Sequence, residues 1–217
     1  MIKAVLFDLI GTTVSETDPE IINNCFEKAF SDNNIPVDTS LIKKDRGKDK
    51  RLIITNVLKF QQLSLSHVQD IYTSFKKNVL TNINKFIENN GAKEIFLYLQ
   101  DRNIKLGIGT GLERDIFTQI FYRLNWNNIH FDYIGIGDET GRGRPYPDMI
   151  FDMMNKLSVS DKGEFLKAGD TVADIEEGKN AKVLTAVILS GTQSKDDLLN
   201  AAPDYVLNSL IDIKKIV

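Results

Sequence analysis

The sequence predicts an α/β fold built on a doubly wound parallel sheet. The chain opens with an apolar run, Ile2 to Phe7, which is typical of a strand buried on both faces. From about residue 90 onward, short apolar segments alternate with segments of helical periodicity. Strands that alternate with helices in this way form parallel sheets with helices on both faces.

The first strand is expected at 2–8. The strands expected after it are short and rich in β-branched and apolar residues. They lie at 105–109, 131–135, 165–169, 185–189 and 204–206. Helices are expected between the strands at 91–103, 113–124, 148–157 and 173–181. A further helix is expected after the last strand. The helix at 148–157 follows Pro147, a residue that is favoured at helix starts.

Residues 15–88 interrupt this alternation. They contain no convincing strand, and apolar residues at helical spacing predict helices after Asp18-Pro19, at about 49–60 and at about 66–80. We therefore expect two domains, an α/β core formed by residues 1–14 and 89–217 and an α-helical domain formed by residues 15–88.

Composition excludes several classes of function. The 217 residues carry a net charge of −3, which gives no reason to expect nucleic acid or a membrane surface as a partner. Apolar runs stay below the roughly 18 residues of a membrane helix. Cys25 is the single cysteine, which excludes an intrachain disulfide and fits a cytoplasmic location. The only two histidines, His67 and His130, lie far apart, so neither a zinc site nor a Ser-His-Asp triad is expected.

Polar residues follow four of the expected elements. Asp8 ends the first strand, Thr110-Gly111 follows the second, Arg144 lies in a Gly-Arg-Pro-Tyr-Pro segment, and Asp170 and Asp174 follow the strand at 165–169. The carboxyl ends of parallel strands share one edge, where open α/β sheets bind ligands. Each residue alone has a simpler explanation, since Asp and Thr-Gly are common in turns and acids cap helices. Arg142 is a rival to Arg144 for the cationic position.

The order Asp, Thr, Arg and acidic pair resembles the four-motif pattern of the haloacid dehalogenase (HAD) superfamily, and the resemblance extends over essentially the whole chain. It implies a Rossmann-like core and assigns residues 15–88 to a helical cap that closes over the site. The alternative for residues 15–88 is a structural insertion with no role in the choice of substrate.

The resemblance also assigns roles to the motif residues. Asp8 would be the nucleophile, since a carboxylate can attack phosphorus and form a covalent intermediate. Mg²⁺, which prefers oxygen ligands, would be held by Asp8, Asp170, Asp174 and the backbone carbonyl of Ile10. Arg144 would neutralise the charge of the nucleophile and of the transferred phosphoryl group. The Thr110 hydroxyl and the Gly111 backbone N–H would donate hydrogen bonds to the phosphoryl oxygens. Substrate binding would involve Thr12, Gly111 and Lys50.

Ile10 departs from the pattern of ordinary HAD phosphatases, which carry a second Asp at this position as the general acid and base. The segments around Asp8, Arg144 and Asp170 instead resemble the phosphonatase-like relatives, which also lack that acid. In phosphonatases a cap lysine forms a Schiff base, and the candidate here is Lys50 in Gly47-Lys48-Asp49-Lys50. Arg46 and Ile53 depart from the phosphonatase pattern. The charge run from 43 to 51 also allows Lys50 to be a substrate-binding or merely exposed lysine.

Together these observations predict a cytoplasmic, Mg²⁺-dependent hydrolase of the phosphonatase-like type. Its expected partner is a small phosphorylated or phosphonated metabolite, transformed through an aspartyl-phosphate intermediate. The alternatives are a phosphoglycolate-type phosphatase and a degenerate, non-catalytic phosphate-binding protein. A dehalogenase fits the acidic pair and the Thr-Gly turn less well. By resemblance, a homodimer formed through the caps is compatible with this prediction.

Overall fold

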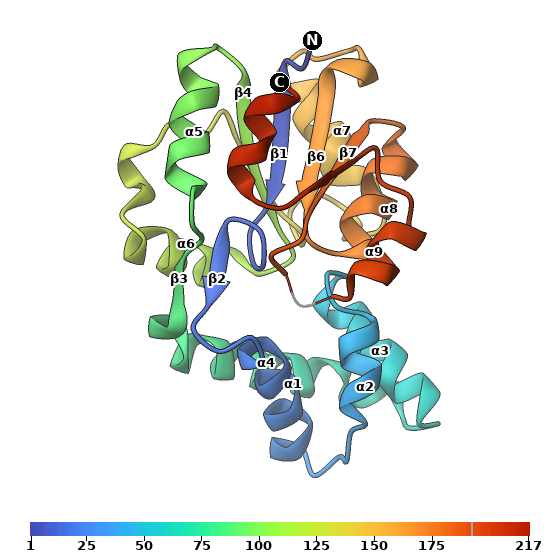
Figure 1. Cartoon of the computed structure of the whole chain (residues 1–217). Coiled ribbons are helices and arrows are strands. Elements are labelled where there is room, and N and C mark those ends of the chain that lie inside the picture. Colours follow the sequence, from blue (N-terminus) through green and yellow to red (C-terminus); the bar gives the residue numbers. More distant parts are fainter. Residues whose placement is uncertain (192) are drawn as a thin grey trace.

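Six parallel strands form one sheet in the order β5-β4-β1-β6-β7-β8 (Figure 1). The computed structural model describes residues 1–191 and 193–217. From β1 the chain proceeds to β4 and β5 on one side, and β6, β7 and β8 follow on the other, so the predicted doubly wound sheet is confirmed. The strands are β1 Ala4–Asp8, β4 Lys105–Thr110, β5 Tyr133–Ile136, β6 Phe165–Gly169, β7 Leu184–Ile188 and β8 Tyr205–Leu207.

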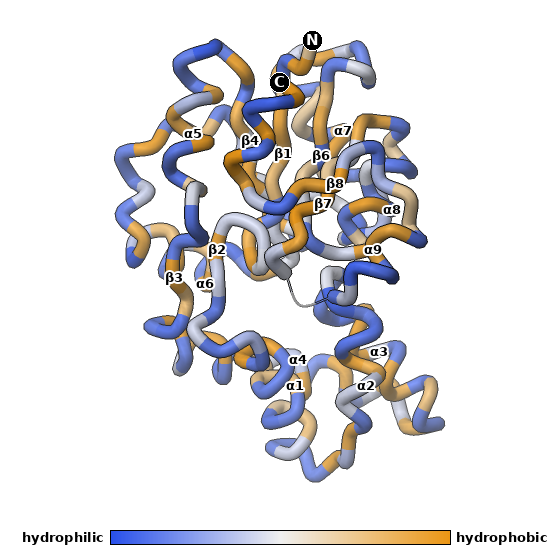
Figure 2. The backbone as a smooth tube through the Cα atoms, in the orientation of Figure 1, coloured by the Kyte–Doolittle hydropathy of each residue, from blue (hydrophilic) through white to orange (hydrophobic). Residues whose placement is uncertain are grey.

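Helices cover both faces of the sheet because β1 is apolar on both sides. Val5 and Phe7 belong to the hydrophobic cluster that includes Phe96 of α5, whereas Ala4 and Leu6 belong to the cluster around the α7 methionines. Figure 2 shows hydrophobic residues along these strands. The helices of this part are α5 Ala92–Asp101, α6 Arg114–Arg123, α7 Asp148–Lys156, α8 Val172–Ala181 and α9 Lys195–Asn200.

Four further helices form a helical insertion, defined here as residues 21–81, beyond the carboxyl ends of the strands (Figure 1). They are α1 Ile21–Asp32, α2 Thr39–Lys44, α3 Lys50–Phe60 and α4 Val68–Thr81. The insertion has its own apolar packing: Phe26 of α1 and Phe75 of α4 stack with ring centroids 4.1 Å apart. The arrangement places the insertion over the edge of the sheet where the motif residues end their strands.

The chain passes between sheet and insertion through two short strands that the sequence did not predict. β2 Val14–Glu16 and β3 Phe86–Glu88 pair antiparallel, with Ser15 opposite Ile87. The expectation of no strand within 15–88 was therefore wrong. Three residues are too few to show a period, and the pairing joins positions about seventy residues apart, which no local pattern records. Both strands lie at the expected domain boundaries, 14/15 and 88/89.

Other differences concern short elements. The expected C-terminal helix is a 3-10 helix, η5 Leu210–Lys215, and α2 and α9 were not expected. Six residues give little periodicity, and α2 and α9 begin instead at the side-chain caps Asp38 and Ser194. The remaining 3-10 segments are η1 Leu65–His67, η2 Ile83–Lys85, η3 Trp126–Asn128 and η4 Lys162–Glu164. Among the described residues, helices are too short or too polar to cross a bilayer.

Candidate active site

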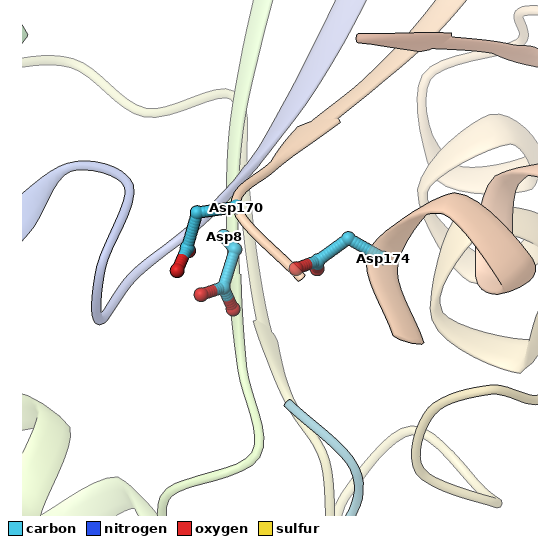
Figure 3. A group of neighbouring side chains, drawn as sticks. All are labelled: Asp8, Asp170 and Asp174. Carbon is cyan, nitrogen blue, oxygen red and sulfur yellow. The ribbon is translucent and has the colours of Figure 1, made fainter. Parts of the chain in front are cut away.

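The fold brings the predicted acidic residues together at the carboxyl edge of the sheet. Asp8 is the last residue of β1, Asp170 directly follows β6, and Asp174 lies in the first turn of α8. Figure 3 shows their three carboxylates converging from these separate elements. One oxygen from each lies within 4.8 Å of the others, and all three residues are buried.

A pocket opens between this edge and the helical insertion. Its core wall includes Asp8, Thr110, Gly111 and Arg144. The facing wall comes from the insertion: Ile22, Arg46, Gly47 and Lys50. Ile10, Leu112 and Thr171 complete the lining. The pocket therefore places the predicted nucleophile, the predicted cation and the predicted cap lysine around one small space.

Arg144 joins two of the carboxylates. One of its guanidinium nitrogens, Nη1, lies 2.6 Å from Asp8 Oδ1 and 2.6 Å from Asp174 Oδ1. Burial opposes the charge of Arg144, but the carboxylates of Asp8 and Asp174 outweigh it and hold the Arg144 pKa above its usual value. The rival Arg142 is exposed and pairs with Asp148 at 2.9 Å, so it lies outside the site.

Both carboxylate oxygens of Asp174 are occupied by protein donors. Oδ1 faces Arg144 and also Lys167 Nζ at 2.9 Å. Oδ2 accepts from the backbone N–H of Thr171 at 3.2 Å and from its hydroxyl at 2.5 Å. The backbone N–H of Asp174 donates in return to Thr171 Oγ1 at 3.3 Å, which completes the capping box of α8. Burial disfavours the ionised carboxylate, but Lys167 and Arg144 outweigh burial and hold the Asp174 pKa below its ordinary value.

Asp170 is held differently. Its Oδ1 accepts a hydrogen bond from the Thr12 hydroxyl at 2.6 Å. A β-carbon would lie 2.2 Å from Asp170 Oδ2 if added at Gly11 and 2.1 Å from it if added at Gly191, so the carboxylate sits where only glycine leaves room. Burial, and then the charges of Asp8 and Asp174, raises the Asp170 pKa to about 8.

Thr12 lies behind the residues that line the pocket. Its side chain is fully buried and its hydroxyl donates to Asp170, and the contact with substrate that the motifs imply for it stays a prediction. Thr110, in contrast, lines the pocket, and its Oγ1 accepts from the Leu112 N–H at 3.1 Å. That hydrogen bond leaves the Thr110 O–H available as a donor.

The buried groups carry an excess of negative charge that suits a divalent cation. Four buried carboxylates, those of Asp8, Asp170, Asp174 and Glu177, accompany two buried cations, Arg144 and Lys167, because the third buried cation, Arg46, is paired with Glu16 of β2. Burial raises the Asp8 pKa, against the opposing effect of Arg144. A hard cation with a preference for oxygen ligands would offset this charge, so the donor set fits Mg²⁺.

The loop from 46 to 50 brings the insertion into contact with the core. Gly47 has a φ of 91°, and a β-carbon on it would lie 2.2 Å from Thr171 Oγ1, so only glycine permits this approach. The backbone N–H of Asp49 donates to the Arg144 carbonyl at 3.4 Å. The insertion is therefore in direct contact with the core loop that carries Arg144.

Two residues of the charge run from 43 to 51 face inward, so the run is not uniformly solvated. Arg46 is buried and pairs with Glu16 of β2 at 2.5 Å. Lys50 is partly buried, and a β-carbon at Gly111 would lie 3.9 Å from its Nζ. Burial, and then the positive charges of Arg144 and Arg46, lowers the Lys50 pKa to about 8. The merely exposed alternative for Lys50 is therefore wrong.

Lys167 and Glu177 were missed by the sequence reasoning, although a signal was present. Lys167 is a charged residue inside the otherwise apolar strand Phe165–Gly169, and a charge at such a position requires a partner. The partners lie on α8, at Asp174 and Glu177. Arg46 gave a weaker signal, because it stands among many exposed charges.

The chain matches the model of the haloacid dehalogenase-like hydrolase family over residues 5–188, and it belongs to that family. The resemblance stated from the motifs is thereby confirmed.

Within this family, the chain is similar in sequence to proteins named phosphonoacetaldehyde hydrolase. The chain is 28% identical over 203 residues to phosphonoacetaldehyde hydrolase from Bacillus cereus, covering 88% of this chain and 77% of the relative. It is 29% identical over 206 residues to the enzyme of that name from Lactiplantibacillus plantarum, with the same two coverages, 88% and 77%.

Solved structures share the fold over nearly the whole chain. A phosphonoacetaldehyde hydrolase-like protein from Oleispira antarctica has a TM-score of 0.86 at 21% identity, covering 99% of this chain and 91% of its own. A protein described as a predicted phosphoglycolate phosphatase from Haemophilus somnus has a TM-score of 0.82 at 19% identity, with coverages of 99% and 97%. At these identities the likeness concerns the fold.

The raised Asp170 pKa predicts how stability depends on pH in the metal-free protein. The folded state keeps a proton that the unfolded chain, with an Asp pKa of 3.8, releases well below pH 8. The free energy of unfolding should therefore fall as pH rises between about 4 and about 8, by up to about 1.4 kcal/mol per pH unit from this group. Asp170→Asn should flatten the decline. Urea unfolding in EDTA checks this, and equal slopes for both proteins would contradict it.

Proposed function

We propose that this hydrolase is Mg²⁺-dependent and phosphonatase-like, and that it acts on a small phosphorylated or phosphonated metabolite through an aspartyl phosphate on Asp8. The observation that carries the proposal is the position of Asp8, paired with Arg144 at 2.6 Å in a pocket that the helical insertion closes. The insertion would act as a cap, so substrate would bind between core and cap.

The metal proposal rests on the unequal surroundings of the acids. Asp8 and Asp170 would ligate the ion directly, together with the Ile10 carbonyl. Asp174 would act through water, because its two oxygens already accept from Arg144, Lys167 and Thr171. When bound, Mg²⁺ would reduce the repulsion between the Asp8 carboxylate and an anionic phosphoryl group.

The chain's own groups would supply the remaining chemistry. Asp8 attacks phosphorus, and the bond from phosphorus to the leaving group breaks as the aspartyl phosphate forms. The Thr110 hydroxyl and the Gly111 N–H donate to the phosphoryl oxygens, and Arg144 compensates for their charge. Water then attacks the phosphorus of the aspartyl phosphate, the bond from phosphorus to the Asp8 oxygen breaks, and Asp8 is regenerated as inorganic phosphate leaves with the oxygen of the water and its proton passes to solvent.

The leaving group separates two versions of this proposal. An oxygen leaving group needs a proton, and the aliphatic side chain of Ile10 cannot supply it. A carbon leaving group needs no such acid if Lys50 forms an imine with a substrate aldehyde and draws the electron pair into an enamine. Lys50 lines the pocket, and its pKa of about 8 leaves part of the amine neutral near neutral pH, which supports the carbon version. Arg46 and Ile53 stand where the phosphonatase pattern has other residues, and this difference favours the version in which an oxygen leaves and the enzyme is a phosphatase.

A substrate panel tests the function. Purified protein is assayed for phosphate release from phosphonoacetaldehyde, phosphoglycolate and other small phosphate esters, with Mg²⁺ or with EDTA. We expect turnover of at least one compound and its loss in EDTA, restored by added Mg²⁺. Full activity in EDTA would contradict the metal assignment. Binding of these compounds without any turnover would instead support the non-catalytic alternative.

Reductive trapping tests the role of Lys50. Borohydride with phosphonoacetaldehyde should inactivate the enzyme and add a reduced adduct at Lys50, located by mass spectrometry. Lys50→Arg should abolish the adduct, because a guanidinium keeps the charge but forms no imine. Trapping should slow about tenfold per pH unit below pH 8, since the lowered pKa sets the fraction of neutral amine, and it should level off above pH 8.

Lys48→Arg is the matched control for this experiment. Lys48 lies two residues away and its ammonium group pairs with Asp45 at 2.7 Å, so this variant should be trapped like the wild type. Absence of an adduct in the wild type, with phosphatase activity retained in Lys50→Arg, would reject the carbon version and leave the phosphatase version.

A further inference from the structure

Lys167 is a lysine buried in the middle of the central sheet. It lies on β6, level with Leu6 of β1 and Thr185 of β7, and its relative exposure is 2%. Helix α8 crosses directly above it: a β-carbon added at Gly178 would lie 3.4 Å from Lys167 Cβ. The aliphatic stem is thus covered by α8, and only the ammonium group reaches the acidic cluster.

The ammonium group joins two acids that lie one turn apart on α8. Lys167 Nζ is 2.9 Å from Asp174 Oδ1 and 3.5 Å from Glu177 Oε2. Glu177 is 1% exposed, and neither of its carboxylate oxygens has a hydrogen-bond partner among the described residues. Glu177 therefore contributes charge beside Lys167 rather than a set of oriented hydrogen bonds.

Stability does not account for this arrangement. Removing each ion from water is costly, and replacing a buried ion pair by apolar residues of similar volume is often neutral or stabilising. Phe165, two residues before Lys167 on β6, and Leu6, level with it on β1, lie on the same face of the sheet and are fully buried and apolar, so an apolar residue would suit this position. A contribution to the site explains the pair better than a contribution to the fold.

We propose that Lys167 is a positioning residue that keeps Asp174 turned toward Arg144 and out of direct contact with the divalent ion. Asp8 and Asp170 then remain the carboxylates that ligate the ion directly. The inference rests on the proposed Mg²⁺-dependent function and adds to it a residue that touches neither ion nor substrate.

The geometry gives the physical reason. Asp174 Oδ1 receives two cationic donors, Arg144 and Lys167, while Oδ2 receives both donors of Thr171. Without the lysine, Oδ1 would regain a free acceptor position and could move toward the ion. Arg144, which shares that oxygen, would then lose part of its alignment on Asp8.

Two variants separate this role from a simple charge effect. Lys167→Met removes one positive charge. The double variant Lys167→Met/Glu177→Leu removes one charge of each sign, so the nominal charge of the cluster stays the same and no unpaired partner is left behind. Lys93→Met, at an exposed position on α5, is the control for loss of a surface lysine. Circular dichroism and thermal unfolding establish that each variant is folded.

The readouts are Mg²⁺ affinity by calorimetry and the number of waters on bound Mn²⁺ by water-proton relaxation. Both Lys167 variants should bind Mg²⁺ at least about tenfold more tightly, because a carboxylate becomes available as a ligand. Bound Mn²⁺ should lose one water in both variants, while phosphate release falls about tenfold or more. Lys93→Met should match the wild type in every readout.

Weaker or unchanged Mg²⁺ binding, or an unchanged water count, in the folded double variant would overturn the inference, since a merely structural lysine predicts one of these results. The proposed function would survive that outcome. A wild-type protein that binds no Mg²⁺ would overturn both the proposed metal-dependent function and this inference.

Discussion

The contact that the rest of the site depends on is the double ion pair of Arg144 with Asp8 and Asp174, 2.6 Å to each carboxylate. It connects the end of β1, the loop before α7 and the first turn of α8. Like-charged carboxylates at one sheet edge would repel one another without a shared cation. Because Arg144 uses one nitrogen for both acids, the positions of three chain segments are set by a single group.

The helical insertion completes this arrangement from the other side. Gly47 contacts the start of α8 at Thr171, and the Asp49 N–H donates to the Arg144 carbonyl, so the insertion touches two of the segments that Arg144 connects. The insertion also brings Lys50 and Arg46 to the pocket. The wall of the pocket opposite the core is therefore positively charged. In the proposed function, this wall accounts for the choice of a small anionic substrate.

Sequence reasoning was most successful where a residue's position follows from its own strand. Asp8, Thr110 and Asp170 come at or just after strand ends, and parallel strands place those ends together, so their convergence was predictable. Lys167 required knowledge that α8 lies over β6, and β2 and β3 pair across about seventy residues. The inward orientation of Lys50 depends on the docking of a loop, which no local pattern of charges reveals.

The central claim is that Asp8 is the nucleophile, and its replacement by an amide of nearly the same size tests it most directly. The measurement is the turnover number of purified Asp8→Asn, checked by mass spectrometry for deamidation, on whichever substrate the wild type hydrolyses. We expect a loss of at least about 10⁴-fold with the fold retained, because an amide is a poor nucleophile toward phosphorus. Turnover within about tenfold of the wild type would contradict a covalent role for Asp8.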